Sequence, residues 1–121
     1  MAKKFNSFGV MLDFSRNGVM TLPSLKNFLT IIRKMGYNTL FLYMEDTYEV
    51  EGEPYFGYMR SKYSIEEMKE IDEFCTSIGM EAIPCIQTLA HMPDGLRWGC
   101  FDSIRDTDAY RVVGSLEQTD Y

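Results

Sequence analysis

Polar side chains follow three short apolar runs of the chain, and their types suit chemistry on a shared ligand. They are Asp13 and Arg16 after the first run, Glu45 and Asp46 after the second, and Gln87 and His91 after the third. Carboxylates, a guanidinium, an amide and an imidazole offer both donors and acceptors. Brought together at one rim, they would suit a ligand rich in hydroxyl groups.

Each of these residues also has a plainer interpretation. Arg16 could be a surface arginine on a turn, and Asp46 could hydrogen-bond its own backbone, a common use of Asp after a strand. His91 is the only histidine of the chain, and a lone loop histidine is more often structural or solvated than catalytic. The residue types alone therefore leave ligand binding and local structure both open.

The elements that must position these residues begin with three strands. The runs at 8–14, 39–44 and 80–86 are short and nearly continuous in apolar residues, which is typical of strands buried on both faces of a parallel sheet. Pro84 cannot donate to a strand ladder, so it favours an edge or a strand end for the third run.

Two amphipathic helices are predicted between the strands. The first begins near Thr21 and Pro23 and ends at Gly36, with apolar residues at steps of three and four. The second begins with a capping box, Ser64 followed by Glu67, and ends at Gly79.

Repeated strand–helix units predict an α/β fold, either a doubly wound sheet or a barrel. The turn after the first strand reads DFSRNG and lacks the G-x-G-x-x-G fingerprint of dinucleotide-binding sheets. We therefore predict a partial (β/α)8 TIM barrel made of its first three strand–helix units, because 121 residues fall far short of the ~250 of a complete barrel. The acidic, aromatic stretch 45–63 predicts a long loop, and a second loop with one short helical turn should follow residue 86.

Composition restricts the binding partners and the cellular compartment that we expect for this chain. Lys and Arg number 12 against 18 Asp and Glu, so a nucleic-acid partner is not expected. The apolar run after the N-terminal lysines is interrupted by Asp13 and Arg16, which leaves neither a signal-peptide core nor a membrane span. The three cysteines, Cys75, Cys85 and Cys100, match no zinc or redox motif and are interpreted as reduced packing residues. We expect a cytoplasmic protein.

Three segments of the chain resemble a known family. They are VMLDFSRNGVM, KMGYNTLFLYMEDTYEVEGEPYFGYMR and IPCIQTLAHM, and the resemblance spans residues 8–113. They are similar to the first three strand-and-loop blocks of the family 20 glycoside hydrolases, the β-N-acetylhexosaminidases, and particularly of the bacterial exo-acting branch. The resemblance implies that residues 1–121 are an N-terminal fragment of a TIM-barrel catalytic domain.

The resemblance also implies an activity. Family 20 enzymes hydrolyse terminal non-reducing GlcNAc or GalNAc residues from β-linked glycans with retention, using the acetamido oxygen of the substrate as nucleophile. Their general acid and acetamido-orienting residue form an Asp–Glu pair after the fourth strand, and no such pair follows a fourth strand here. The chain would thus supply binding and supporting residues and be inactive alone. The alternatives are a non-catalytic carbohydrate-binding remnant and another barrel hydrolase acting on β-linked sugars.

Site residues carry over from the family by position. Asp46 and His91 resemble an aspartate and a histidine that support the catalytic Glu through hydrogen bonds. The implied substrate-binding residues are Arg16, which resembles the arginine that holds ring hydroxyls, together with Asp13, Glu45 and Trp98. No metal or cofactor is implied. The implied partners are an amino-sugar-terminated oligosaccharide and, because three strands leave two open edges, a complementary fragment or a second copy of the chain.

Overall fold

The elements of the structure follow the predicted order of strand, helix, strand, helix, strand. This computed structural model describes residues 5–88, 90 and 92–105. The elements are β1 (Gly9–Asp13), α1 (Leu22–Lys34), β2 (Thr39–Tyr43), α2 (Ile65–Ser77), β3 (Glu81–Cys85) and a 3-10 helix, η1 (Gly99–Ile104). The strands are one or two residues shorter than predicted, and η1 is the short helical turn expected after residue 86.

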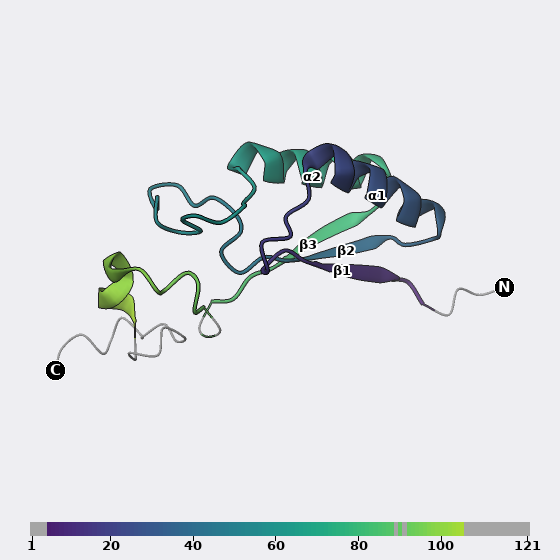
Figure 1. Cartoon of the computed structure of the whole chain (residues 1–121). Coiled ribbons are helices and arrows are strands. Elements are labelled where there is room, and N and C mark those ends of the chain that lie inside the picture. The colour runs from purple at the N-terminus through teal and green to yellow at the C-terminus, as the bar shows by residue number, and fades with distance from the viewer. Residues whose placement is uncertain (1–4, 89, 91, 106–121) are drawn as a thin grey trace.

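The three strands form one parallel sheet. Their order is β1-β2-β3, and the register pairs Leu12 with Leu42 and Leu42 with Pro84. Both helices lie on the same face of this sheet, as Figure 1 shows. The α/β fold with parallel strands is therefore confirmed, whereas closure into a barrel needs further strands and stays a prediction.

The core lies between the sheet and the two helices. α1 contributes an apolar stripe, Leu25, Leu29 and Ile32, whose spacing of four and three residues faces the sheet. α2 starts with the predicted capping box, in which the Ser64 hydroxyl accepts from the Glu67 amide. The buried core residues are Phe14, Leu25, Leu29, Ile32, Leu40, Leu42, Met44, Tyr63, Ile71, Cys75 and Met80. Burial of these side chains, at about 25 cal/mol per Å² of apolar surface, is what holds the helices on the sheet.

The other face of the sheet corrects one expectation. We expected strands buried on both faces, but exposure alternates along β1, and the Met11 side chain is 56% exposed. The reason is that both helices cover the face to which Val10 and Leu12 belong. On the opposite face the ring of Phe41 leans over β1, where a Cβ on Gly9 would lie 2.8 Å from it.

Pro84 lies at the open edge of β3, as its chemistry predicts. The Glu81 amide donates to Asn38 O on the β2 side, and alternate residues of a strand face alternate neighbours. The nitrogen of Pro84 thus faces away from β2. Its missing N–H costs no hydrogen bond within the described sheet, which is why the run still forms a strand.

The predicted loop between β2 and α2 is a compact string of turns. It is closed at its base by a bridge between Tyr48 and Tyr63, where the Glu49 amide donates to Tyr63 O at 2.9 Å. The Tyr63 hydroxyl donates to Met20 O at 2.7 Å, and burial raises the pKa of Tyr63 to about 12. This anchoring fixes the loop against the segment that follows β1.

Two further expectations concern a membrane span and the state of the three cysteines. Among the described residues, neither helix has the length and apolar content needed to cross a bilayer. All three cysteines are free thiols, and Cys75 alone among them is fully buried. Burial raises the pKa of Cys75 to about 11, so this thiol packs rather than reacts.

Candidate functional site

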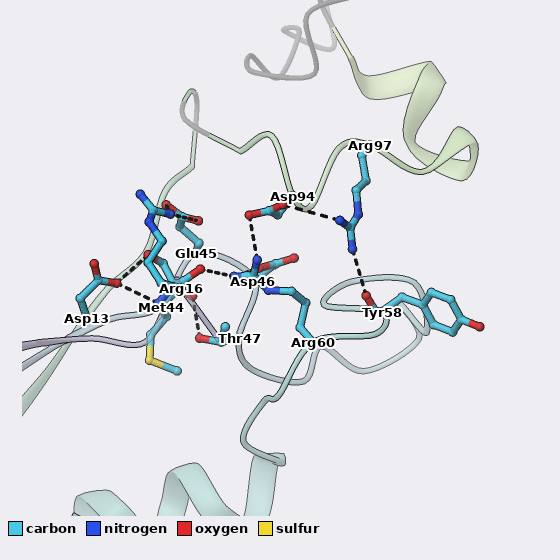
Figure 2. Close-up of polar contacts among 11 residues, drawn as sticks. Asp13, Arg16, Met44, Glu45, Asp46, Thr47, Tyr58, Arg60, Asp94 and Arg97 are labelled. Carbon is cyan, nitrogen blue, oxygen red and sulfur yellow. Dashed lines mark hydrogen bonds and ion pairs between the residues drawn. The ribbon is translucent and has the colours of Figure 1, made fainter. Parts of the chain in front are cut away.

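Four of the polar residues singled out in the sequence, Asp13, Arg16, Glu45 and Asp46, lie at one edge of the sheet. Because the strands are parallel, their carboxyl ends lie together, and the residues after β1 and β2 approach one another there. Figure 2 shows Asp13, Arg16, Glu45 and Asp46 in this region, with Arg60, Asp94 and Arg97 extending the cluster to one side. The predicted gathering is therefore present for the residues that follow β1 and β2.

The segment after β1 holds its polar groups in a tight turn. Asp13 Oδ1 accepts from the Ser15 amide at 2.9 Å and from the Ser15 hydroxyl at 2.6 Å. The hydroxyl bond is the main reason that the pKa of Asp13 is lowered. Phe14 and Ser15 are buried, so the turn is anchored while Arg16, the next residue, projects outward with a side chain 67% exposed.

The segment after β2 turns at once and separates two neighbouring carboxylates. Thr47 closes this turn through its hydroxyl, which donates to Met44 O at 2.6 Å. Glu45 takes a φ of 52°, a left-handed conformation that is uncommon for a residue other than glycine and is found at functional sites. Glu45 lies 3.4 Å from Arg16 Nη1, whereas Asp46 points to Arg60.

Asp46 is a buried carboxylate. Its side chain is 2% exposed, and its Oδ1 lies 3.2 Å from Arg60 Nη2. This contact is an ion pair without an aligned hydrogen bond, since neither Asp46 oxygen has a hydrogen-bond partner among the described residues. Burial raises the pKa of Asp46, and the positive charge of Arg60 opposes that rise. The plainer interpretation, an Asp that only caps its own turn, does not account for this ion pair.

The segment after β3 contributes Asp94, which sequence reasoning missed. Asp94 Oδ2 lies 2.8 Å from Arg60 Nη1, and its Oδ1 lies 3.7 Å from Arg97 Nη1. A cavity of about 10 Å³ between Asp94, Glu45, Asp46, Met92 and Gly95 has room for about one water molecule. His91 lies outside the described residues, so the structure does not place the predicted partner of Asp46.

Trp98 lies apart from the other predicted substrate-binding residues. Its ring packs edge-on against Tyr58 at 5.1 Å between centroids, and the Arg97 guanidinium lies 4.7 Å from its centre. Among the described residues, a path of contacts leads from Trp98 through Arg97, Asp94 and Arg60 to Asp46. Its expected place in the wall of the sugar pocket stays a prediction.

Among the described residues the charges form no metal site, and the neighbouring cleft is mostly apolar. Within residues 5–88, 90 and 92–105, no group of three or more His, Cys, Asp or Glu side chains is arranged to hold a metal ion. A cleft of about 380 Å³ lies nearby, lined mostly by apolar residues that include Phe56, Leu96 and Phe101. Because Arg16, Asp46 and Asp13 do not line it, this cleft is not the binding site that the charges indicate.

A solved structure matches this arrangement of strands and helices. It is "A Glycoside Hydrolase Family 20 beta-N-Acetylglucosaminidase", with 23% sequence identity to this chain and a TM-score of 0.65. The match covers 74% of this chain and 21% of that chain, so this chain spans about a fifth of the length of its structural neighbour. At this identity the similarity concerns the fold. No family model matches the chain, and no curated protein gives a significant match.

Little in the sequence singles out Arg60 or Asp94. Arg60 lies in an aromatic loop without periodicity, and Asp94 follows a proline in a polar stretch, where an Asp commonly serves a turn. One available signal was Gly57. A Cβ at this position would lie 2.2 Å from Asp46 O, and its φ is +65°, so the loop must pass close to the second strand end.

Proposed function

We propose that this chain forms the first three strand–helix units of a (β/α)8 barrel that hydrolyses β-linked N-acetylhexosamine residues at the non-reducing ends of glycans. The carrying observation is the convergence of Arg16, Glu45 and Asp46 at the carboxyl ends of parallel strands. This edge is where barrel enzymes bind their substrates. Structural similarity to a β-N-acetylglucosaminidase supports the choice of sugar.

In this proposal Arg16 is the main contact to the sugar. Its guanidinium is largely exposed and is held at its base by Glu45, so it presents a fork of donors to adjacent ring hydroxyls. Glu45 is buried and orients Arg16, and Asp13 flanks it from the end of β1. Trp98 would approach the sugar from the outer side of the cluster.

Asp46 has a supporting role together with His91. A buried carboxylate of raised pKa suits a group that orients a histidine and, through it, the catalytic acid. The reaction proceeds with retention, and the acetamido oxygen of the substrate acts as nucleophile. No metal or redox cofactor has a part in these steps.

The catalytic acid and the acetamido-orienting residue would come from outside these 121 residues. The chain has two adjacent Asp and Glu pairs that could be considered, Glu45–Asp46 and Asp72–Glu73. The first is divided between two arginines, and the second is exposed on α2. Neither pair suits a proton donor and its partner above a sugar ring.

The open sheet supports the same proposal. Parallel sheets are normally covered on both faces, yet here Met11 is exposed on the face opposite the helices, and β1 and β3 are edge strands. Further strands, supplied by a longer chain, a complementary fragment or a second copy, would bury this face. Hydrolysis would require those strands.

The test compares two chains on chromogenic N-acetyl-β-glucosaminide and N-acetyl-β-galactosaminide. One chain has the 121 residues, and the other continues the coding sequence through the remaining strands. Activity in the longer chain alone is the expected result. In that chain Arg16→Ala should chiefly raise KM, whereas Asp46→Asn and His91→Ala should chiefly lower kcat.

Three other outcomes would change the proposal. Hydrolysis by the 121-residue chain would contradict the assignment of the acid to a later strand. If neither chain is active but the shorter one binds N-acetylglucosamine, a non-catalytic carbohydrate-binding role replaces hydrolysis. Activity on a different β-linked sugar would indicate another barrel hydrolase.

A further inference from the structure

Arg60 is a buried cation, and the sequence analysis predicts no role for it. It lies in the loop between β2 and α2, and its side chain is 7% exposed. A charge is buried at high cost unless its partners compensate it. The contacts of Arg60 therefore identify what it holds in place.

The guanidinium of Arg60 contacts the segments that follow all three strands. Its Nη2 donates to Ser15 O after β1 and lies 3.2 Å from Asp46 Oδ1 after β2. Its Nη1 donates to Asp94 Oδ2 after β3 at 2.8 Å. Figure 2 shows Arg60 between Asp46 and Asp94, with Arg97 on the far side of Asp94. One side chain thus connects three segments that are far apart in the sequence.

The loop backbone is shaped so that Arg60 reaches this position. Gly57, with a φ of +65°, passes so close to the second strand end that a Cβ would lie 2.2 Å from Asp46 O. The Arg60 amide then donates to Gly57 O at 3.1 Å, which closes a turn. Met59, inside this turn, has a φ of 60°. The left-handed φ of Met59, a residue other than glycine, two positions after Gly57 indicates a constrained conformation.

We propose that Arg60 is a positioning residue of the sugar site, which holds the three strand-end segments in one arrangement and fixes the Asp46 carboxylate in place by pairing with it. The reference to a sugar rests on the proposed function. The coupling of Arg60 to Asp46 does not, because it follows from the contacts alone.

The surrounding charges support this role. Arg97, Asp94, Arg60 and Asp46 alternate in sign along a chain of contacts. Burial is the largest influence on the pKa of Asp46 and raises it; Asp94 raises it further, while Arg60 and Arg97 lower it. Glu45, the other adjacent carboxylate, lies next to Arg16. Arg60 is the leading opposing charge, so its loss should leave Asp46 readily protonated.

Lysine is not expected to replace Arg60 fully. A guanidinium has five donors in a rigid fork, whereas an ammonium is a single point charge. Lysine at position 60 would restore the positive charge near Asp46 but could not contact Ser15 O, Asp46 and Asp94 together. This difference separates the electrostatic part of the role from the geometric part.

The first test follows the Asp46 carboxyl carbon by NMR during a pH titration of the 121-residue chain. Arg60→Gln should shift the Asp46 midpoint upward, and Arg60→Lys should return much of that shift. The matched control is Lys62→Gln, because Lys62 lies on the same loop and donates to Phe56 O without contacting Asp46. An Asp46 midpoint that is the same in the wild type and Arg60→Gln would overturn the proposal.

The second test measures binding of N-acetylglucosamine to the same chains by chemical-shift titration. Arg60→Gln should weaken binding roughly tenfold, Arg60→Lys should weaken it less, and Lys62→Gln should leave it unchanged. Equal affinity in all four chains would overturn the positioning role. If the wild-type 121-residue chain binds no sugar, sugar binding requires the further strands, and the Asp46 titration by itself decides whether Arg60 is coupled to Asp46.

Arg60→Lys keeps the proposal testable if Arg60→Gln does not fold. In Arg60→Lys the carbonyl carbon of Ser15 should move upfield, since it loses a hydrogen bond from the fork. An unchanged Ser15 carbonyl shift together with an unchanged Asp46 midpoint would show that the three segments do not depend on the guanidinium.

Discussion

Two neighbouring carboxylates, Glu45 and Asp46, belong to two very different ion pairs. Glu45 lies 3.4 Å from Arg16, whose side chain is 67% exposed. Asp46 lies 3.2 Å from Arg60, whose side chain is 7% exposed. The distances are similar, but one cation faces solvent and the other is enclosed by three segments of the chain.

The difference shows how one turn can contribute both to ligand binding and to the stability of the fold. The left-handed φ of Glu45, 52°, sends successive side chains in different directions. The Arg16 guanidinium is exposed, so water screens its charge and its contact with the buried Glu45 contributes little to stability, which leaves Arg16 able to contact a ligand. A buried pair cannot lose one member cheaply, because the other charge is left without compensation. The following predictions test this contrast.

Removal of Arg60 should have the largest effect on stability. Arg60→Met leaves the buried Asp46 carboxylate and the partly exposed Asp94 carboxylate without their shared cation, and we expect the free energy of unfolding to fall by about 3–5 kcal/mol. The control is Lys26→Met, which breaks the exposed Lys26–Glu70 pair between the helices and should cost no more than about 1 kcal/mol. Urea unfolding followed by circular dichroism measures both. Equal losses in the two variants would contradict the contrast.

Substitution of Gly57, which lies against the backbone of Asp46, should have the second largest effect on stability. Gly57→Ala requires a left-handed alanine and a shift of Asp46 O, which is 2.2 Å from the added Cβ. We expect a loss of about 3 kcal/mol. Gly52→Ala is the matched control, because Gly52 has a φ of +82° but no atom within 4 Å, so it should cost only about 1 kcal/mol. Thermal unfolding distinguishes them, and similar losses would mean that the contact with Asp46 is unimportant.

Asp46 should make a smaller, pH-dependent contribution. Its pKa in the folded protein is raised above 3.8, so the folded state holds this proton more tightly than the unfolded chain does. The stability that this group contributes is present below pH 3.8 and is lost as pH rises through the folded-state pKa. Asp46→Asn should remove this component. Unfolding free energies of both chains, measured between about pH 3 and pH 7, should diverge in that direction, and parallel curves would contradict it.

Arg16 should have the smallest effect on stability. Arg16→Gln breaks only the pair with an exposed guanidinium, and we expect a change of about 0.5 kcal/mol or less in unfolding free energy. Its effect on N-acetylglucosamine binding should be much larger, because the side chain is the proposed sugar contact. A large loss of stability without loss of binding would reverse the roles assigned to Arg16 and Arg60.

Much of the fold could be predicted because its signals are local. The stripe that ends with Ile32, the capping box at Ser64 and the apolar run around Leu42 each encode an element within a few residues. The strand-end positions of Arg16 and Asp46 followed from the same pattern. Burial on both faces of the strands was wrong, because an apolar run does not specify which neighbours cover it.

Sequence by itself determined the parallel α/β arrangement and the edge where polar residues gather, since strands, helices and their order are encoded in hydrophobic spacing and turn chemistry. Only the tertiary structure decided which charges pair. Arg60 contacts Ser15, Asp46 and Asp94 because folding brings together three segments far apart in the chain. Such contacts have no sequence period, so spacing along the chain could not reveal them.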